Sequence, residues 1–299
     1  MRKEPQINSL QNKNKAICEL NGWLFSLYKG NIQLFMKHVL SLVLLAFSIL
    51  QHAFAQKSNT IYTADEVTEG AGAEVRRLFP GSSFKHLDPF ILLDDFSVQP
   101  PAGFPAHQHR GFEAITYMIE GGFIHKDNIG NNDTIFAGDA QRFTAGNGLI
   151  HSEMPGTNAI NRGLQLWLNI PLAAKKLPPS YQLVNSNSIK IDSTKNIITR
   201  TIAGPESALH TNCGCDLTYL DISLKNDSLF FSPLAGYSTY IYLLSGTIKI
   251  NDATLQEGQF YLLENTYKNK IESSADARFV YLSAKPLNQP IKQRGPFVD

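Results

Sequence analysis

The chain has 299 residues, of which 43% are hydrophobic and 18% are charged, and its formal net charge at pH 7 is +1. Fifteen prolines and 21 glycines are ordinary usage, which excludes collagen-like, coiled-coil and largely disordered chains. The near-zero charge argues against a nucleic-acid binder, and three cysteines are too few for a disulfide scaffold or a zinc ribbon. The composition indicates a globular protein long enough for one large or two ordinary domains.

Residues 1–55 resemble a leader rather than a domain. A lysine precedes an apolar run at residues 39–50, and the small-x-small sequence Ala53-Phe54-Ala55 follows it. The run is shorter than the roughly 18–20 residues that a membrane span needs. We therefore expect a true start at Met36, cleavage after Ala55, and an exported protein, periplasmic or secreted, with no membrane attachment. The alternative is a buried apolar helix.

Strand patterns dominate the remaining chain. Short β-branched and aromatic runs at residues 114–119, 163–169 and 240–244 are each followed by turn residues or proline. Long 3.6-residue periodicity is absent. Many short strands with frequent turns predict an all-β sandwich or barrel.

A weak internal repeat predicts two such domains. The sequence ITYMIEGGFIH, which contains Gly121, resembles YIYLLSGTIKI, which contains Gly246: in each, one strand precedes the glycine and another follows it. We expect the first domain at residues 56–182 and the second at residues 183–299.

Two short motifs carry the candidate chemistry. They are His107-Gln-His109 and His151-Ser-Glu153, and each places two ligand-type side chains two residues apart. Residues two apart on a strand point to the same face, so two such strands in a small barrel would converge on one point. Three imidazoles and one carboxylate suit Fe(II), Mn(II), Co(II), Ni(II) or Cu(II), and they leave coordination positions open. Zinc is also possible, although structural zinc more often recruits cysteine.

The second copy of the repeat lacks these ligands. The positions that correspond to the first motif are Ser232 and Leu234, and those that correspond to the second are Ile271 and Ser273. We therefore expect one metal ion per chain.

Several other polar residues have two interpretations each. Glu113 is either a further ligand or partner of the site, or a buried acceptor for an imidazole N–H. Arg110 either holds an anionic substrate or forms a structural ion pair, and His125 is interpreted as a structural histidine rather than a fifth ligand. Cys213 and Cys215 are expected to be two thiols, with redox reactivity as the alternative, because an extended backbone separates such Cα atoms by nearly the ~6.8 Å limit for a disulfide.

Longer stretches around these motifs resemble the pirin family, tandem cupin proteins related to quercetin 2,3-dioxygenases. The matching stretches are residues 87–96, 101–113, 138–141, 144–155 and 163–169, with a C-terminal echo at 286–290 and 295–297. The resemblance implies two cupin barrels and the metal ligands His107, His109, His151 and Glu153, all of which are present. Many cupins place a ligand where Glu113 stands, whereas pirin-like proteins use the position of Glu153. Iron and quercetinase activity are implied by the resemblance alone.

The expected function is therefore a metal-dependent dioxygenase, with Fe(II) favoured, that opens the ring of flavonol-type or other polyphenolic substrates. A small aromatic molecule and O2 would be its partners, Glu153 would accept the substrate's proton, and the protein would be a monomer. The main alternative is a non-catalytic metal-binding cupin that acts as a sensor or protein-interaction module. A non-oxidative isomerase or lyase on the same scaffold is a third possibility, because a fold alone does not determine chemistry.

Overall fold

The structure is a computed structural model, and it describes residues 61–263 and 267–299. The expected start at Met36 and cleavage after Ala55 lie outside these residues. The described chain is nearly all β-strand, with two short 3-10 helices, η1 (Ala174–Lys176) and η2 (Ser186–Ser188). No helix in this part of the chain has the length and apolar character needed to span a bilayer. The prediction of an all-β fold with two tandem barrels is confirmed.

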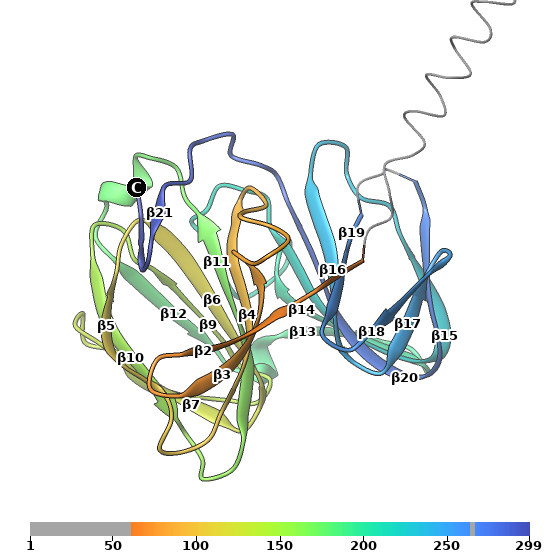
Figure 1. Ribbon diagram of the computed structural model, residues 1–299, viewed down its shortest axis with the longest axis horizontal. Helices are drawn as coiled ribbons and strands as arrows, with labels where there is room; N and C mark the ends of the chain where they lie inside the picture. Colours follow the sequence, from red (N-terminus) through yellow and green to blue (C-terminus); the bar gives the residue numbers. More distant parts are fainter. Residues whose placement is uncertain (1–60, 264–266) are drawn as a thin grey trace, which may run out of the picture. The chain divides into compact units, whose positions relative to one another are not determined.

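The first barrel consists of two antiparallel sheets (Figure 1). Seven strands have the order β12-β9-β6-β11-β4-β3-β2, and four have the order β5-β10-β7-β8. In chain order the strands are β2 (Asp65–Glu69), β3 (Ala73–Phe79), β4 (Phe90–Val98), β5 (Phe104–His109), β6 (Phe112–Glu120), β7 (Gly122–Asp127), β8 (Asn132–Phe136), β9 (Ala140–Thr144), β10 (Leu149–Pro155), β11 (Asn161–Asn169) and β12 (Ser180–Val184). The last of these crosses the expected division after residue 182.

The second barrel is one nine-stranded sheet that folds over itself (Figure 1). Its main path is β1-β19-β16-β20-β15-β14-β13, and β17 pairs with both β18 and β20. The strands are β1 (Ile61–Thr63), β13 (Lys190–Ser193), β14 (Ile197–Ala203), β15 (Thr218–Phe231), β16 (Ser238–Ser245), β17 (Thr247–Ile250), β18 (Ala253–Gln256), β19 (Gln259–Leu262) and β20 (Asn269–Ala284). The register between β15 and β20 shifts at Asn226, whose φ of +46° is left-handed.

The N-terminal end of the described chain contacts the second barrel, and the C-terminal end contacts the first barrel. The first strand, β1, pairs with β19 of the second barrel. The last strands, β21 (Gln293–Arg294) and β22 (Phe297–Val298), form a hairpin that returns to the first barrel, where Phe297 bridges to Arg110. The C-terminal residues therefore belong structurally to the half of the molecule that contains the histidine motifs.

Strand β6 shows why the seven-stranded sheet is buried on both faces. Alternate side chains point in opposite directions along a strand. Ile115 and Tyr117 therefore join the core between the barrels, whereas Phe112 and Ala114 point into the first barrel.

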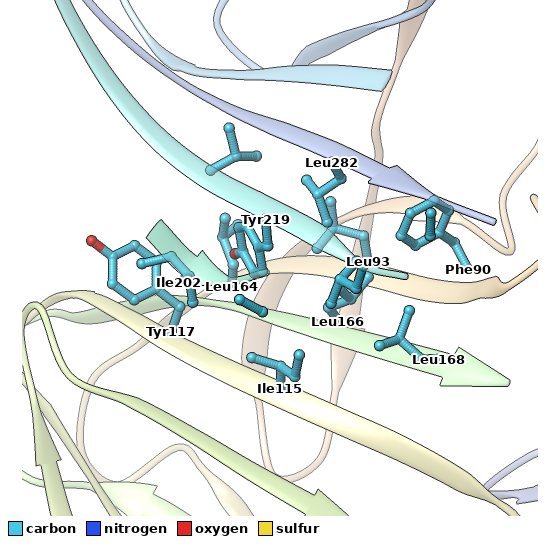
Figure 2. Close-up of a cluster of buried hydrophobic side chains, with 14 of the residues drawn as sticks. Phe90, Leu93, Ile115, Tyr117, Leu164, Leu166, Leu168, Ile202, Tyr219 and Leu282 are labelled. Atoms are coloured by element: carbon cyan, nitrogen blue, oxygen red, sulfur yellow. The ribbon is translucent and has the colours of Figure 1, made fainter. Parts of the chain in front are cut away.

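Strand β11 alternates in the same way. Three of its leucines pack against residues of the second barrel, as Figure 2 shows for Leu164, Leu166 and Leu168 beside Tyr219 and Leu282. The side chains between these leucines consequently point into the first barrel.

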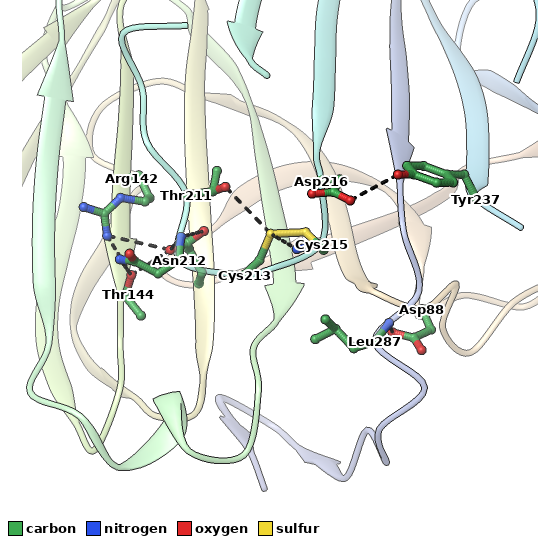
Figure 3. Close-up of a disulfide and its surroundings, with 11 residues drawn as sticks. Asp88, Arg142, Thr144, Thr211, Asn212, Cys213, Cys215, Asp216, Tyr237 and Leu287 are labelled. Atoms are coloured by element: carbon green, nitrogen blue, oxygen red, sulfur yellow. Dashed lines mark hydrogen bonds and ion pairs between the residues drawn. A yellow bond between two sulfur atoms is a disulfide. The ribbon is translucent and has the colours of Figure 1, made fainter. Parts of the chain in front are cut away.

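The loop at residues 204–217 connects β14 to β15 of the second barrel and contacts the first barrel. It contains a disulfide between Cys213 and Cys215, contrary to the expectation of two thiols (Figure 3). The expectation assumed extended backbone. Gly214 instead has a φ of +64°, and this turn brings the two Cα atoms to 5.2 Å. The neighbouring Asn212 donates its side-chain amide to Thr144 Oγ1 at 3.0 Å, which anchors the loop on the first barrel.

Candidate metal centre

Two neighbouring strands present the histidine motifs to one another. Strands β5 and β10 are antiparallel, and His107 lies directly opposite His151 in their register. Because side chains two residues apart share a face, His109 points the same way as His107, and Glu153 points the same way as His151. The local sequence and strand pairing thus bring the four expected ligand residues to the same part of the barrel.

These residues form two overlapping clusters. The ligand atoms of His107, His109 and His151 all lie within 4.8 Å of one another, and so do those of His125, His151 and Glu153. His151 belongs to both clusters. Its Nε2 atom lies 3.0 Å from Nε2 of His107, and its Nδ1 atom lies 3.4 Å from Nδ1 of His125.

Burial keeps two of these imidazoles neutral. His109 and His151 are only 3% and 1% exposed. Burial, together with the nearby His107, lowers the pKa of His109 to about 3, and burial with the surrounding imidazoles holds the pKa of His151 well below its usual value. His107 is partly exposed, so the cluster is open to solvent on its side.

The backbone around the site determines which ring nitrogen carries a proton. His107 Nδ1 lies 2.7 Å from the carbonyl oxygen of Pro105, and His109 Nδ1 lies 3.4 Å from that of Pro296. A carbonyl only accepts hydrogen bonds, so each Nδ1 is the donor and each neutral ring keeps its lone pair on Nε2. The tautomers are assigned from these partners.

The arrangement fits a metal ion. Nε2 of His107, which carries a lone pair, lies 3.0 Å from Nε2 of His151, and this separation requires a proton or a cation between the two atoms. Nitrogens in adjacent positions on one ion lie roughly 3 Å apart, because metal–nitrogen bonds are about 2.0–2.1 Å long. The His/Glu cluster can therefore bind one metal ion with nitrogen and oxygen donors.

Two glutamines that the sequence analysis missed orient the carboxylate of Glu153. Gln141 Nε2 donates to Oε1 at 2.7 Å, and Gln165 Nε2 donates to Oε2 at 2.7 Å. Trp167 Nε1 in turn donates to Gln165 Oε1 at 3.0 Å. The available signal was an amide at position 165 that alternates with leucines in β11, which predicts a polar side chain pointing into the barrel.

The structure separates Glu113 from the metal cluster. Its carboxylate accepts hydrogen bonds from Thr144 Oγ1 at 2.7 Å and from the backbone N–H of Asn212 at 2.8 Å, and no imidazole is among its hydrogen-bond partners. Glu113 is a neighbour of Phe112 in β6 and so points away from the barrel interior, toward the loop at 204–217. The prediction that it partners an imidazole or a metal was wrong, because it anchors this loop.

Arg110 forms an ion pair rather than part of a binding pocket. Its Nη2 lies 2.9 Å from Asp299 Oδ1, and its guanidinium lies 5.0 Å from the ring centroid of Phe297. The side chains of Arg110 and Asp299 are both largely exposed. Of the two interpretations of Arg110, the structure supports the structural one, because both contacts attach the C-terminal hairpin to the first barrel.

Comparisons with known proteins agree with this architecture. A family model described as Pirin matches residues 72–168, and one described as Pirin C-terminal cupin domain matches residues 219–299. A pirin-like protein of Solanum lycopersicum is 38% identical over 240 residues, which cover 77% of this chain and 82% of the relative. The chain belongs to the pirin family. The pirin of Homo sapiens is 35% identical over 251 residues, which cover 78% of this chain and 84% of that protein.

Solved structures give the same result. A quercetin 2,3-dioxygenase from Acinetobacter baumannii superposes with a TM-score of 0.72 at 30% identity, and the match covers 80% of this pirin-family chain and 90% of that one. The bacterial pirin YhhW from Escherichia coli, in complex with nickel(II), superposes with a TM-score of 0.62 at 18% identity, covering 76% of this chain and 100% of that one. The second likeness concerns the fold alone.

Proposed function

We propose that this pirin-family protein is a metal-dependent dioxygenase that oxidises flavonol-type or other polyphenolic substrates. The observation that carries the proposal is the convergence of three imidazoles, with one Nε2–Nε2 separation of 3.0 Å, beside the buried Glu153. The likeness to a structure described as a quercetin 2,3-dioxygenase supports the choice of substrate class.

The residues that would hold the metal ion are His107, His109, His151 and Glu153. Fe(II) is the proposed metal, and this donor set also accepts Mn, Co, Ni, Cu or Zn. When bound, the ion supplies Lewis acidity that favours the deprotonated form of a substrate hydroxyl. The protein contributes neutral nitrogen donors, because burial lowers the pKa of both His109 and His151.

Glu153 is proposed to be the catalytic base. The two glutamine amides and the hydroxyl of Thr116, 3.3 Å from Oε1, all face its carboxylate as donors. These donors fix the direction of its two oxygen atoms. Glu153 is therefore suited to accept a proton from a phenolic hydroxyl held beside it. The partly exposed side of the site at His107 is the proposed route for an aromatic substrate and O2.

Export by the segment that ends at Ala55, the division after residue 182 and a monomeric state remain proposals alongside this function. The expected cleavage site determines which form of the protein is used in the test. The form that begins at Gln56 contains every described residue and omits the expected leader.

The test is O2 uptake by this form after anaerobic loading with Fe(II), measured on mixing with quercetin. We expect uptake that requires both metal and flavonol, that disappears in His109→Ala and that persists in His210→Ala. His210 is an exposed histidine outside the metal cluster, so it is a matched control. Full metal loading without uptake, repeated with Mn, Co, Ni and Cu, would contradict the dioxygenase and would favour a metal-binding sensor or interaction module.

A further inference from the structure

Two buried residues on β7 continue the site on the far side of His151. His125 and Asp127 share a face of this strand, and Asp127 lies opposite His151 in the register between β7 and β10. The atoms form a chain: Asp127 Oδ2 lies 3.3 Å from His125 Nε2, and His125 Nδ1 lies 3.4 Å from His151 Nδ1. The side chains of His125 and Asp127 are completely buried.

The position of Asp127 is determined by its own loop. Its Oδ1 accepts the backbone N–H groups of Ile129 at 3.0 Å and Asn131 at 2.9 Å, and its Oδ2 accepts the Asn131 side-chain amide at 2.6 Å. These three donors favour an ionised carboxylate, which can only accept hydrogen bonds. The ring of His125 is held in turn by Tyr181, which stacks on it at 4.7 Å between centroids with an interplanar angle of 18°.

The direction of every hydrogen bond in the chain follows from that carboxylate. Because Asp127 accepts, His125 donates through Nε2, and a His125 ring that carries a single proton keeps its lone pair on Nδ1. His151 must then donate through Nδ1, which leaves its own lone pair on Nε2. That lone pair is directed at the cluster, where Nε2 of His107 lies 3.0 Å away.

We propose that Asp127 and His125 are positioning residues that set the tautomer of His151, so that its Nε2 lone pair is presented to a metal ion. This inference rests on the metal centre proposed above, and it assigns a role to two residues outside the expected ligand set. Such partners orient a metal-binding imidazole and increase its basicity.

The direct test is the tautomer of His151 in the metal-free protein at mildly alkaline pH, measured by long-range 1H–15N NMR. The wild-type protein is expected to carry the His151 proton on Nδ1. In Asp127→Asn, the amide oxygen remains on the two backbone N–H groups, the NH2 group faces His125, and the Asn131 amide turns its oxygen toward that NH2 group. His125 must then accept at Nε2 and donate from Nδ1, so the proton of His151 should move to Nε2.

The second readout is the affinity for Zn(II) alone, measured by competition with a chromophoric chelator. We expect Asp127→Asn to weaken binding by about 10- to 100-fold. His125→Phe keeps an aromatic ring beside Tyr181 but removes the acceptor, and it should weaken binding similarly. Asp276→Asn is the matched control, because Asp276 is 78% exposed on the second barrel, and it should change neither readout.

The inference is overturned if wild-type His151 carries its proton on Nε2, or if Asp127→Asn leaves both the tautomer and the Zn(II) affinity equal to those of the control. If the wild-type protein binds no metal at all, the proposed metal centre is wrong. A His151 tautomer that does not change in Asp127→Asn would separately contradict the positioning role of Asp127 and His125. A protein that binds Zn(II) as expected but does not consume O2 would support this inference while contradicting the dioxygenase.

Discussion

The hydroxyl of Tyr117 in the first barrel donates a 2.8 Å hydrogen bond to the carboxylate of Asp221 in the second barrel. Asp221 is completely buried and is also held by two hydrogen bonds from Arg278, at 2.9 and 2.8 Å. Burial raises the pKa of Tyr117, so its hydroxyl remains a donor. This polar contact lies at the edge of an otherwise apolar core, where Figure 2 shows Tyr117 beside Ile202.

Removing this hydroxyl should destabilise the interface between the barrels. We predict that Tyr117→Phe lowers the free energy of unfolding by about 1–3 kcal/mol, because a buried carboxylate loses one of its donors. Urea denaturation measures the change. Tyr237→Phe is the control, since it removes a solvent-exposed hydrogen bond to Asp216 (Figure 3). Equal decreases in the free energy of unfolding of the two variants would show that the buried hydrogen bond contributes no more than the exposed one.

The orientation of Glu153 should depend on Gln141. In Gln141→Leu the carboxylate keeps its contacts with Gln165 and Thr116 but loses the 2.7 Å bond to Oε1. We predict a decrease in Zn(II) affinity of about tenfold with the fold retained, because partners of a metal ligand tune its binding. Chelator competition measures the affinity. Gln182→Leu, which removes an amide bonded to the Ala208 carbonyl instead, should bind as the wild type does; a similar loss there would count against the assigned role.

Lys175 should secure the C-terminal hairpin on the first barrel. Its Nζ donates to Gly111 O at 2.7 Å, Asn169 Oδ1 at 2.9 Å and Val298 O at 3.0 Å. Lys175→Met leaves these acceptors without a donor, so the free energy of unfolding should fall by about 1–3 kcal/mol.

The same substitution should weaken Zn(II) binding, because the hairpin carries the Pro296 carbonyl that faces His109. Urea denaturation and chelator competition measure the two effects of Lys175→Met. The exposed Lys190→Met is the comparison and should have little effect on either. An unchanged Zn(II) affinity in Lys175→Met would show that the C-terminal hairpin does not support metal binding.

Burial of His86 should make stability depend on pH. Burial lowers the pKa of this histidine below 6.5, and Lys85 adds to the effect. The unfolded chain therefore binds a proton that the native protein resists, and the contribution of His86 to stability is lost as the pH falls below about 6.5. Denaturation at about pH 8 and about pH 5 should show a smaller loss of stability for His86→Gln than for the wild type. An identical loss of stability in the wild type and in His86→Gln would show that His86 is not a source of the pH dependence.

Strand periodicity explains which parts of the site the sequence could predict. The shared faces of His107 with His109, and of His151 with Glu153, follow from the two-residue repeat of any strand. The same repeat was not applied to Glu113, which lies in a sheet covered on both faces and so had two buried directions available.

Contacts between distant residues were beyond sequence reasoning. The carbonyl that faces His109 belongs to Pro296, 187 positions away, and only the return of the C-terminal hairpin brings it there. The disulfide was missed for a local reason, since a glycine between two cysteines can adopt a positive φ that shortens their separation. The tandem all-β fold was predictable because turn glycines and strand patterns recur in both halves.

Metal stoichiometry tests the central claim most directly. After loading with Fe(II) or Zn(II) and removal of free metal, elemental analysis should find one ion per chain in the wild type and in His210→Ala. His151→Ala should retain almost none, because it removes the residue that the two clusters share. A wild-type protein that holds no metal, or a His151→Ala protein that holds as much as the wild type, would contradict the account.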